Sequence, residues 1–203
     1  MKMKIRCKWA EFDEITKRYH DKEWGTPIYD DQVLFEFLIL EGAQAGLSWN
    51  TILQKRENFR KAFDNFDYKK IARYGKKKVE ELLNNAGIIR NRLKIDAAIA
   101  NANALLKVQN EFGSFSNYIW SFVDNNPIIN NFKTLEELPA KTEQSELISK
   151  DLKKRGFKFV GPTIIYSFMQ AVGMTNDHII ECFRFKEINQ IIKSSANIKQ
   201  FHF

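Results

Sequence analysis

The sequence predicts an all-α fold, and three observations lead to this prediction. Apolar residues recur at spacings of three and four along most of the 203-residue chain, which is the periodicity of an amphipathic helix. No run shows a convincing period of two, so no strands are predicted. The 9 glycines and 4 prolines are too few for a sandwich of short strands and turns. We expect a single domain of two lobes over residues 1–203.

In the first half of the chain, the predicted helices begin after residues that can cap a helix N-terminus. Asp30 or Asp31 precedes a helix whose apolar side recurs at helical spacing as far as Glu41, and Gly42 and Gly46 are expected to interrupt its end. The other helices predicted in this half are one after Ser48 that carries Ile52 to Phe63, a short one from Asp67 that stops at Gly75, and one over residues 76–86 with Gly87 as the glycine that follows it.

In the second half, the helical pattern continues but is interrupted by an irregular segment. Residues 91–112 predict a long amphipathic helix, and residues 115–123 predict a shorter one. Residues 124–139 contain two prolines and several asparagines and predict a loop. After residue 173, a short helix is expected over residues 177–183. Residues 186–203 have apolar residues at helical spacing and form an appendage of unknown role.

Between about residues 145 and 173 the pattern predicts two helices joined by a tight turn. Gly156 can end the first helix in a left-handed conformation, and Pro162 can open the second, where a missing N–H costs nothing. Gly161 leaves the backbone N–H groups of this helix start exposed, so they could bind a phosphate without reading sequence. The alternative is an ordinary helical hairpin with a solvated basic end. The basic side chains expected around such a phosphate are Lys153, Lys154, Arg155 and Lys158.

Both cysteines and two of the three histidines could form one metal site. Cys7 and His20 lie near the start of the chain, and His178 and Cys182 lie near its end. The spacing of four between the last two predicts that they share one face of a helix. Two Cys and two His form a soft, tetrahedral ligand set suited to structural zinc. The alternative is that they are separate buried thiols and unrelated histidines.

A third group combines aromatic residues with one carboxylate. Tyr19 and Trp24 precede the apolar segment that ends at Glu41, and Trp49 follows it. Aromatic faces around a buried carboxylate would suit a flat, cationic ligand that donates hydrogen bonds. The alternative is an exposed carboxylate at a helix end.

The composition limits the classes of protein that this chain can represent. Lys and Arg exceed Asp and Glu by 32 to 25, so the net charge is +7 and a polyanionic partner, nucleic acid above all, is expected. Hydrophobic residues at 44% exclude disorder, and two cysteines exclude a disulfide framework. No apolar run reaches the ~18–20 residues that span a bilayer, and the first residues contain no apolar signal segment. We therefore expect a cytoplasmic protein without membrane partners.

Several long motifs resemble one known family. CKW, YHDKEWG, LFEFLILEGAQAGLSWNTIL, NAGIIRNRLKI, LKKRGFKFVGPTIIYSFMQAVG and NDHIIEC occur in this order. They are similar to the bacterial DNA-3-methyladenine glycosylase I family over about residues 7–184. That family belongs to the helix-hairpin-helix DNA glycosylases, which are all-α. The resemblance implies a monofunctional hydrolase that flips 3-methyladenine out of alkylated double-stranded DNA, releases the free base and leaves an abasic site. We expect a monomer.

The resemblance also implies roles for individual residues. The zinc ligands fall on Cys7, His20, His178 and Cys182, and the zinc is structural, joining residues 1–25 to residues 174–185. The base pocket falls on Tyr19, Trp24, Glu41 and Trp49, with Glu41 as the catalytic and specificity residue that accepts hydrogen bonds from the adenine amino edge. The residues implied at the DNA are Gln44, Gly46 and Leu47, which fill the gap left by the flipped nucleotide, together with Lys153, Lys158 and Gly161.

The sequence departs from the family pattern at two positions and lacks features of other branches of the superfamily. Thr16 stands where many relatives have a second tyrosine, and Ala43 where many have glutamine. Thr163 occupies the position of the nucleophilic lysine of strand-cutting relatives, so no Schiff base is expected. Asp177 is interpreted as a helix N-cap rather than a catalyst. Two cysteines cannot hold an iron–sulfur cluster.

Two other classes of protein compete with the enzyme hypothesis. A non-enzymatic helix-hairpin-helix DNA-binding protein would keep the hairpin and the charge but would have lost the pocket. A zinc-stabilised scaffold without a nucleic-acid role would leave the basic hairpin unexplained. The presence of all four pocket residues favours the enzyme.

Overall fold

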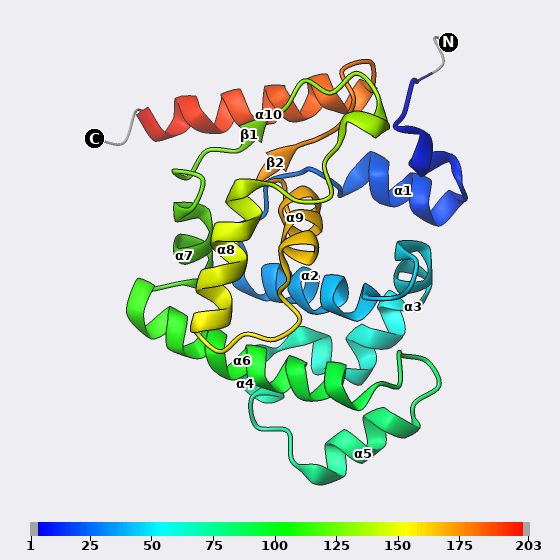
Figure 1. Ribbon diagram of the computed structural model, residues 1–203, viewed down its shortest axis with the longest axis vertical. Helices are drawn as coiled ribbons and strands as arrows, with labels where there is room; N and C mark the ends of the chain where they lie inside the picture. The colour runs from blue at the N-terminus through cyan, green and yellow to red at the C-terminus, as the bar shows by residue number, and fades with distance from the viewer. Residues whose placement is uncertain (1–3, 201–203) are drawn as a thin grey trace.

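The protein is almost entirely helical in the computed structural model, which describes residues 4–200, and the side chains of residues 4–194 (Figure 1). The all-α prediction is confirmed. The α-helices of the described residues are α1 (Glu14–Lys22), α2 (Asp31–Gln44), α3 (Trp49–Ala62), α4 (Tyr68–Ile71), α5 (Lys76–Asn84), α6 (Arg92–Phe112), α7 (Phe115–Ser121), α8 (Glu143–Lys154), α9 (Pro162–Ala171) and α10 (Phe183–Gln200). Short 3-10 helices span Lys8–Glu11, Asp64–Phe66 and Leu135–Glu137.

Helices α2 and α9 form the centre of the fold. They contact each other, and α9 also packs along α8 to form a helical hairpin (Figure 1). Helix α2 is apolar on all sides and is buried from Leu34 to Ala43, as expected for a helix in the middle of a core. Because α2 is enclosed, polar side chains that it carries are held inside the molecule.

Local capping explains where most of the predicted helices begin. The side chains of Asp30, Ser48, Asp67 and Asn91 accept hydrogen bonds from backbone N–H groups in the first turns of α2, α3, α4 and α6. The predicted interruption at Gly42 is wrong, since α2 continues to Gln44. A side chain at position 42 would lie only 3.2 Å from the Phe159 Cβ, so the glycine allows the turn between α8 and α9 to approach α2.

Two other predictions are wrong, and one helix was missed. The predicted helix over residues 177–183 is a turn, and α10 begins at Phe183. In this turn the Ile180 N–H donates to the carbonyl of Phe132, and the Phe183 N–H donates to that of Ile5. Helix α5 ends at Asn84, and Gly87 is not its terminating residue. Helix α1 was not predicted, although Asp13 caps it.

The chain also contains a minimal sheet that periodicity could not predict. Strands β1 (Ile128–Ile129) and β2 (Thr175–Asn176) are parallel, and Ile128 pairs with Thr175. Two residues are too short a run to show an alternating pattern. The pairing holds the irregular segment before α8 against the segment that leads into α10.

The appendage predicted over residues 186–203 is the continuation of α10, which lies across one end of the molecule above β1 and β2 (Figure 1). Ile188 is fully buried, and the Asn176 side chain donates to Phe185 O and to Asn189 Oδ1. The first turns of α10 are therefore anchored on β2. Residues 201–203 of the predicted appendage lie outside the described part of the chain.

Within the described residues, no helix combines the length and the apolar character that crossing a membrane requires.

The end of α9 gives a test of the packing. Gly173 has a φ of +73°, and a Cβ at this position would lie 2.4 Å from the backbone N of Pro27. We expect Gly173→Ala to lower the free energy of unfolding by at least about 2 kcal/mol, because the clash is with backbone. Gly75→Ser is the control, since its Cβ would meet nothing within 4 Å and serine is a good N-cap for α5. Equal stability of both variants in urea unfolding would contradict this packing.

Candidate functional site

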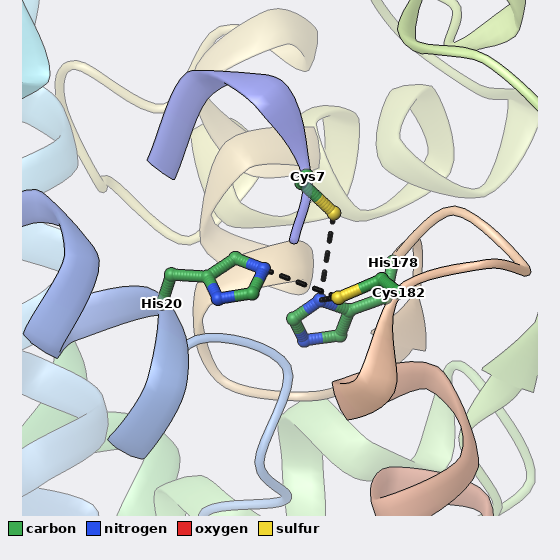
Figure 2. A group of neighbouring side chains, drawn as sticks. All are labelled: Cys7, His20, His178 and Cys182. Carbon is green, nitrogen blue, oxygen red and sulfur yellow. Dashed lines mark hydrogen bonds between the residues drawn. The ribbon is translucent and has the colours of Figure 1, made fainter. Parts of the chain in front are cut away.

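The predicted metal ligands lie together, although they come from opposite ends of the chain. Cys7, His20, His178 and Cys182 are all buried, and their ligand atoms lie within 4.8 Å of one another (Figure 2). Cys7 Sγ lies 3.7 Å and Cys182 Sγ 3.6 Å from His178 Nδ1, and Cys182 Sγ lies 3.4 Å from His20 Nε2. These four atoms could hold a metal ion. We call this group the Cys/His cluster.

The remaining nitrogen of each histidine is bound to a partner outside the cluster. His20 Nδ1 lies 2.9 Å from Asp21 Oδ1, and Asp21 in turn accepts hydrogen bonds from Arg6. His178 Nε2 lies 3.1 Å from the carbonyl oxygen of Trp24. Such outer contacts fix the ring orientation and the tautomer, so His20 Nε2 and His178 Nδ1 are left to face the sulfurs.

The cluster is formed by a turn and not by a helix. His178 and Cys182 were predicted to share a helix face, but both lie in the turn before α10. The Cys182 N–H donates to the carbonyl of Ile179, so the turn brings both side chains to the same side. The predicted ligands thus converge through a different local structure from the one predicted.

The four residues predicted for the base pocket line one cavity of about 310 Å³. Tyr19 and Trp24 come from α1 and the residues after it, Glu41 from α2, and Trp49 from the start of α3. The ring centroids of Tyr19 and Trp49 lie 5.5 Å apart. The cavity is therefore an aromatic pocket with one carboxylate in its lining.

Burial dominates the chemistry of Glu41. Its side chain is 4% exposed, and no ion pair to it occurs among the described residues. Burial raises the pKa of Glu41 from 4.5 to about 8. Burial, and next the charge of Glu41, also raise the pKa of the Tyr19 hydroxyl. The interpretation of Glu41 as an exposed helix-end residue is therefore wrong, and the buried alternative is correct.

Sequence reasoning missed several residues of this pocket. Trp9 lines it from the N-terminal segment, with its ring centroid 5.0 Å from that of Trp24. Ser167 and Gln170 line it from α9, where their spacing of three puts them on one face. Trp9 lies within the CKW motif, so the sequence contained a signal for it. Nothing in the sequence distinguished the two polar residues of α9 from ordinary surface positions.

Residues predicted at the DNA surround a second cavity of about 180 Å³ beside Glu41. Gln44, Gly46 and Leu47 form a turn between α2 and α3, which we call the probe turn (residues 44–47), and Thr163 faces it from α9. Gly46 has a φ of +80°, and Leu47 is exposed. In α9 the first helical N–H donor is that of Ile165, which bonds to the Gly161 carbonyl. Earlier N–H groups at this end have no partner in the helix.

The helical hairpin has the predicted form but only part of the predicted charge. Gly156 has a φ of +94° and Pro162 is the first residue of α9, as expected. Lys153 and Lys158 are exposed. The side chain of Arg155, however, is bound to Asp151 and Glu111 at 2.6 and 2.7 Å. The prediction that Arg155 surrounds a phosphate is therefore wrong, because this guanidinium ties the hairpin to α6.

Asp177 does not cap a helix as predicted. It is buried and directly follows β2, and its carboxylate accepts four hydrogen bonds, two at each oxygen. The donors, at 2.6–2.8 Å, are Asn130, Thr175, Tyr166 and Gln170. Since Gln170 also lines the aromatic pocket, Asp177 fixes one wall of that pocket.

Comparison with known proteins identifies the family. The family model for methyladenine glycosylase matches residues 9–185, most of the chain. The chain belongs to the methyladenine glycosylase family. It is 51% identical over 177 residues to DNA-3-methyladenine glycosylase 1 of Escherichia coli (strain K12), a match that covers 87% of this chain and 95% of that protein.

Solved structures of this family share the fold. A crystal structure of 3-methyladenine DNA glycosylase I is 52% identical and superimposes with a TM-score of 0.86, covering 88% of this chain and 98% of the other. A tyrosine-to-phenylalanine variant in complex with 3-methyladenine is 35% identical, with a TM-score of 0.85 over 88% of this chain and 96% of the other. The later residues of α10 extend beyond the family match.

The raised pKa of Glu41 predicts a pH-dependent effect on stability. The folded state holds this proton up to about pH 8, whereas the unfolded chain releases it near pH 4.5, so ionisation lowers stability as pH rises through this window. Glu41→Gln cannot ionise, and we expect its thermal midpoint to exceed that of the unchanged protein by about 3 °C or more at pH 8.5, with a smaller difference at pH 5.

The control for this measurement is Glu80→Gln, since Glu80 is exposed on α5. Its thermal midpoint should follow that of the unchanged protein at both pH values. A difference for Glu41→Gln that does not grow between pH 5 and pH 8.5 would mean that the Glu41 carboxyl is not buried as described.

Proposed function

We propose that this protein is a monofunctional DNA glycosylase that excises 3-methyladenine from alkylated double-stranded DNA by hydrolysis and leaves an abasic site. The proposed setting is base excision repair in the cytoplasm. The observation that carries the proposal is the buried, unpaired carboxylate of Glu41 within an aromatic pocket. The names of the relatives support it, since they are DNA-3-methyladenine glycosylases.

The pocket suits the chemistry of the damaged base. Adenine methylated at N3 in DNA carries a positive charge, which aromatic faces attract by about 0.5–2 kcal/mol per contact. A cationic base would also be the missing partner of Glu41, because ionising a buried carboxyl without one is costly. Binding of the cation therefore favours the ionised form of Glu41, which accepts hydrogen bonds from the adenine amino edge. The guanine carbonyl at that edge would be repelled.

Variants of relatives are consistent with these roles. One solved structure is the tyrosine-to-phenylalanine variant bound to 3-methyladenine, and another is a glutamate-to-glutamine variant from Staphylococcus aureus. The two replaced residues are as far apart in sequence as Tyr19 and Glu41 are in this chain. From the lining of the pocket we assign Tyr19, Trp24 and Trp49 to stacking around the base, and Glu41 to specificity and catalysis.

The proposed substrate needs little chemical assistance from the protein. The cationic base is already a good leaving group, so no general acid has to protonate it. The protein must extrude the nucleotide, hold the base in the pocket and let water complete the displacement. Thr163 at the start of α9 cannot form an imine with the sugar, which favours hydrolysis without strand cleavage.

Two surfaces are assigned to the DNA itself. The probe turn, with Gln44, Gly46 and Leu47, would occupy the gap that the flipped nucleotide leaves, since Leu47 is exposed at its tip. Gly161 and the open N–H groups at the start of α9 would bind a backbone phosphate, assisted by Lys153 and Lys158.

The Cys/His cluster fits a structural zinc ion. In a tetrahedral site with Zn–S of about 2.3 Å and Zn–N of about 2.0–2.1 Å, neighbouring sulfur and nitrogen ligands lie about 3.6 Å apart. Three of the four sulfur–nitrogen distances of the cluster are 3.4, 3.6 and 3.7 Å, and the fourth, between Cys7 and His20, is within 4.8 Å. Four protein ligands leave no open position, so the role assigned to the ion is stabilisation.

Release of free base tests the proposed function. Incubation with methylated duplex DNA, followed by chromatography of the released bases, should yield 3-methyladenine and an uncut strand with an abasic site. Glu41→Gln should slow excision by about 1–3 kcal/mol, or about 5- to 150-fold, because it replaces a charged acceptor. Glu80→Gln should excise at the normal rate. Absence of 3-methyladenine release by the unchanged protein would refute the proposal.

The assignment of zinc predicts a metal content and a metal-dependent stability. We expect one zinc per chain in elemental analysis of protein that has not met a chelator. Cys182→Ser should lose the zinc and lower the thermal midpoint by at least about 6 °C, because metal binding contributes folding free energy. A strong chelator should lower the midpoint of the unchanged protein but not that of the variant. A well-folded, zinc-free protein would contradict this assignment.

The hairpin assignment predicts a salt-dependent and sequence-independent binding of DNA. Each lysine that contacts a phosphate contributes about −0.9 to the slope of log affinity against log salt. Reversing Lys153 and Lys158 to glutamate should therefore weaken binding to undamaged duplexes of any sequence and flatten the slope by about 2. Reversing Lys76 and Lys77, exposed on α5, is the control of equal charge. Equal slopes for the two double variants would contradict the assigned surface.

A further inference from the structure

The end of α2 is weakly held by its own backbone, although the probe turn begins there. The last turn of α2 contains no basic residue that could bind its carbonyls. The Ala45 N–H donates to the Gly42 carbonyl across 3.4 Å, which is longer than the usual range of about 2.7–3.2 Å. The Leu47 N–H donates to the Gln44 carbonyl instead of continuing the helix. The position of the probe turn therefore depends on groups from another part of the fold.

Lys94 of α6 supplies this contact. Its ammonium group donates to the Ala43 carbonyl at 2.8 Å and to the Ala45 carbonyl at 2.7 Å, on either side of Gln44. A cation is favourable at the C-terminus of a helix, where the carbonyl ends of the peptide dipoles are exposed. One side chain thus binds both the last turn of α2 and the first residues that follow it.

In its own helix, Lys94 is unfavourably placed. It lies in the first turn of α6, where its backbone N–H donates to the side chain of Asn91. A cation in the first turn opposes the helix dipole. Burial lowers the pKa of Lys94, so the charge is held there at a cost. The position of this lysine is therefore explained by the two carbonyls that it binds and not by the stability of α6.

Helix α6 is a firm support for this contact because it also holds the helical hairpin. Seven residues after Lys94, the buried side chain of Asn101 donates to the Lys158 carbonyl at 3.0 Å and accepts from the Lys158 N–H at 2.7 Å. Lys94 and Asn101 lie on one face of α6, about 10 Å apart along its axis. Together they connect α6 to the probe turn and to the hairpin, the two surfaces assigned to the DNA.

We propose that Lys94 is a positioning residue for extrusion of the damaged nucleotide. This inference rests on the proposed function, in which the probe turn occupies the gap that the nucleotide leaves. Lys94 acts through the carbonyls of Ala43 and Ala45 and does not have to touch the base or the sugar. Because the end of α2 is bound to α6, Gln44 and Leu47 enter the DNA from a fixed position. A turn free to shift would give way to the stacked bases.

Lys94→Met tests the proposal, since it removes the ammonium group and keeps a flexible stem. Excision from methylated duplex DNA is measured in a single turnover at saturating protein, so that weaker DNA binding does not contribute. We expect excision to be about 10- to 100-fold slower, as for a misplaced positioning group. Affinity for free 3-methyladenine, measured by calorimetry, should stay within about threefold, because the residues assigned to the base are unchanged.

A duplex that contains a stable abasic-site analogue reports the gap itself. The unchanged protein should bind this duplex more tightly than an undamaged one, because the probe turn occupies the gap. In Lys94→Met the ratio of the two affinities should fall at least about fivefold. A residue that only stabilises the fold would change the thermal midpoint, and would alter neither this ratio nor the excision rate at a temperature where the variant is folded.

Two further substitutions control for charge and for donors. Lys94→Arg keeps both the charge and the N–H donors, and should excise within about threefold of the unchanged protein. Lys107→Met removes the same charge from an exposed position of the same helix, and should excise at the normal rate. If Lys94→Met does not fold, Lys94→Gln, a shorter and uncharged donor, is measured in its place with the same result expected.

The outcomes distinguish this inference from the proposed function. An unchanged protein that neither binds 3-methyladenine nor releases it from DNA would refute the proposed function, and this inference with it. Where the unchanged protein releases the base, the inference requires slow excision, normal affinity for the free base and a reduced preference for the abasic duplex in Lys94→Met. Any other pattern overturns it, including an unchanged protein that shows no such preference.

Discussion

The arrangement of the aromatic pocket depends on one constraint, which is the convergence of Cys7, His20, His178 and Cys182. Two chain segments more than 150 residues apart meet there, and the ligand atoms lie within 4.8 Å of one another. The cluster also fixes the aromatic residues beside it. His20 directly follows Tyr19, and the ring of Trp24 lies 4.6 Å from that of His178. The cluster therefore positions two walls of the aromatic pocket, Tyr19 and Trp24. No atom of the cluster has to contact a ligand in that pocket.

Two buried carboxylates on α2 have opposite environments, and the contrast indicates their roles. Glu36 accepts hydrogen bonds from Arg56 and Arg60, so its charge is neutralised within the fold and links α2 to α3. Glu41 lies more than one turn later and has no ion pair among the described residues. A fold could remove this cost with an apolar residue. Retaining an ionisable carboxyl at such a position is consistent with a partner that arrives from outside, and a cationic base is such a partner.

Local signals predicted most of the helices, but not α1, the two short strands or the turn before α10. Caps such as Ser48 act within a few residues, so the start of α3 could be predicted. The turn that carries His178 and Cys182 is shaped by bonds to Phe132 and Ile5, which no local pattern reveals. The ligands were still predictable, because so few cysteines and histidines are available, and the pocket followed from the family resemblance. The pairing of Arg155 with Glu111 was missed because it depends on which distant segments pack together. Trp9 was missed although the CKW motif contains it.

Helix α9 connects the surfaces that the proposed function requires. Thr163 at its start faces the probe turn, and Gln170 near its end lines the base pocket, seven residues or about 10 Å along the axis. Asp177 holds Gln170 through a 2.8 Å hydrogen bond and Tyr166 through one of 2.6 Å, so the helix is fixed to the segment that carries the cluster. Under the proposed function, a phosphate bound at the start of α9 would thereby be held at a set distance from Glu41. The position of α9 would then limit how deeply a flipped base enters the pocket.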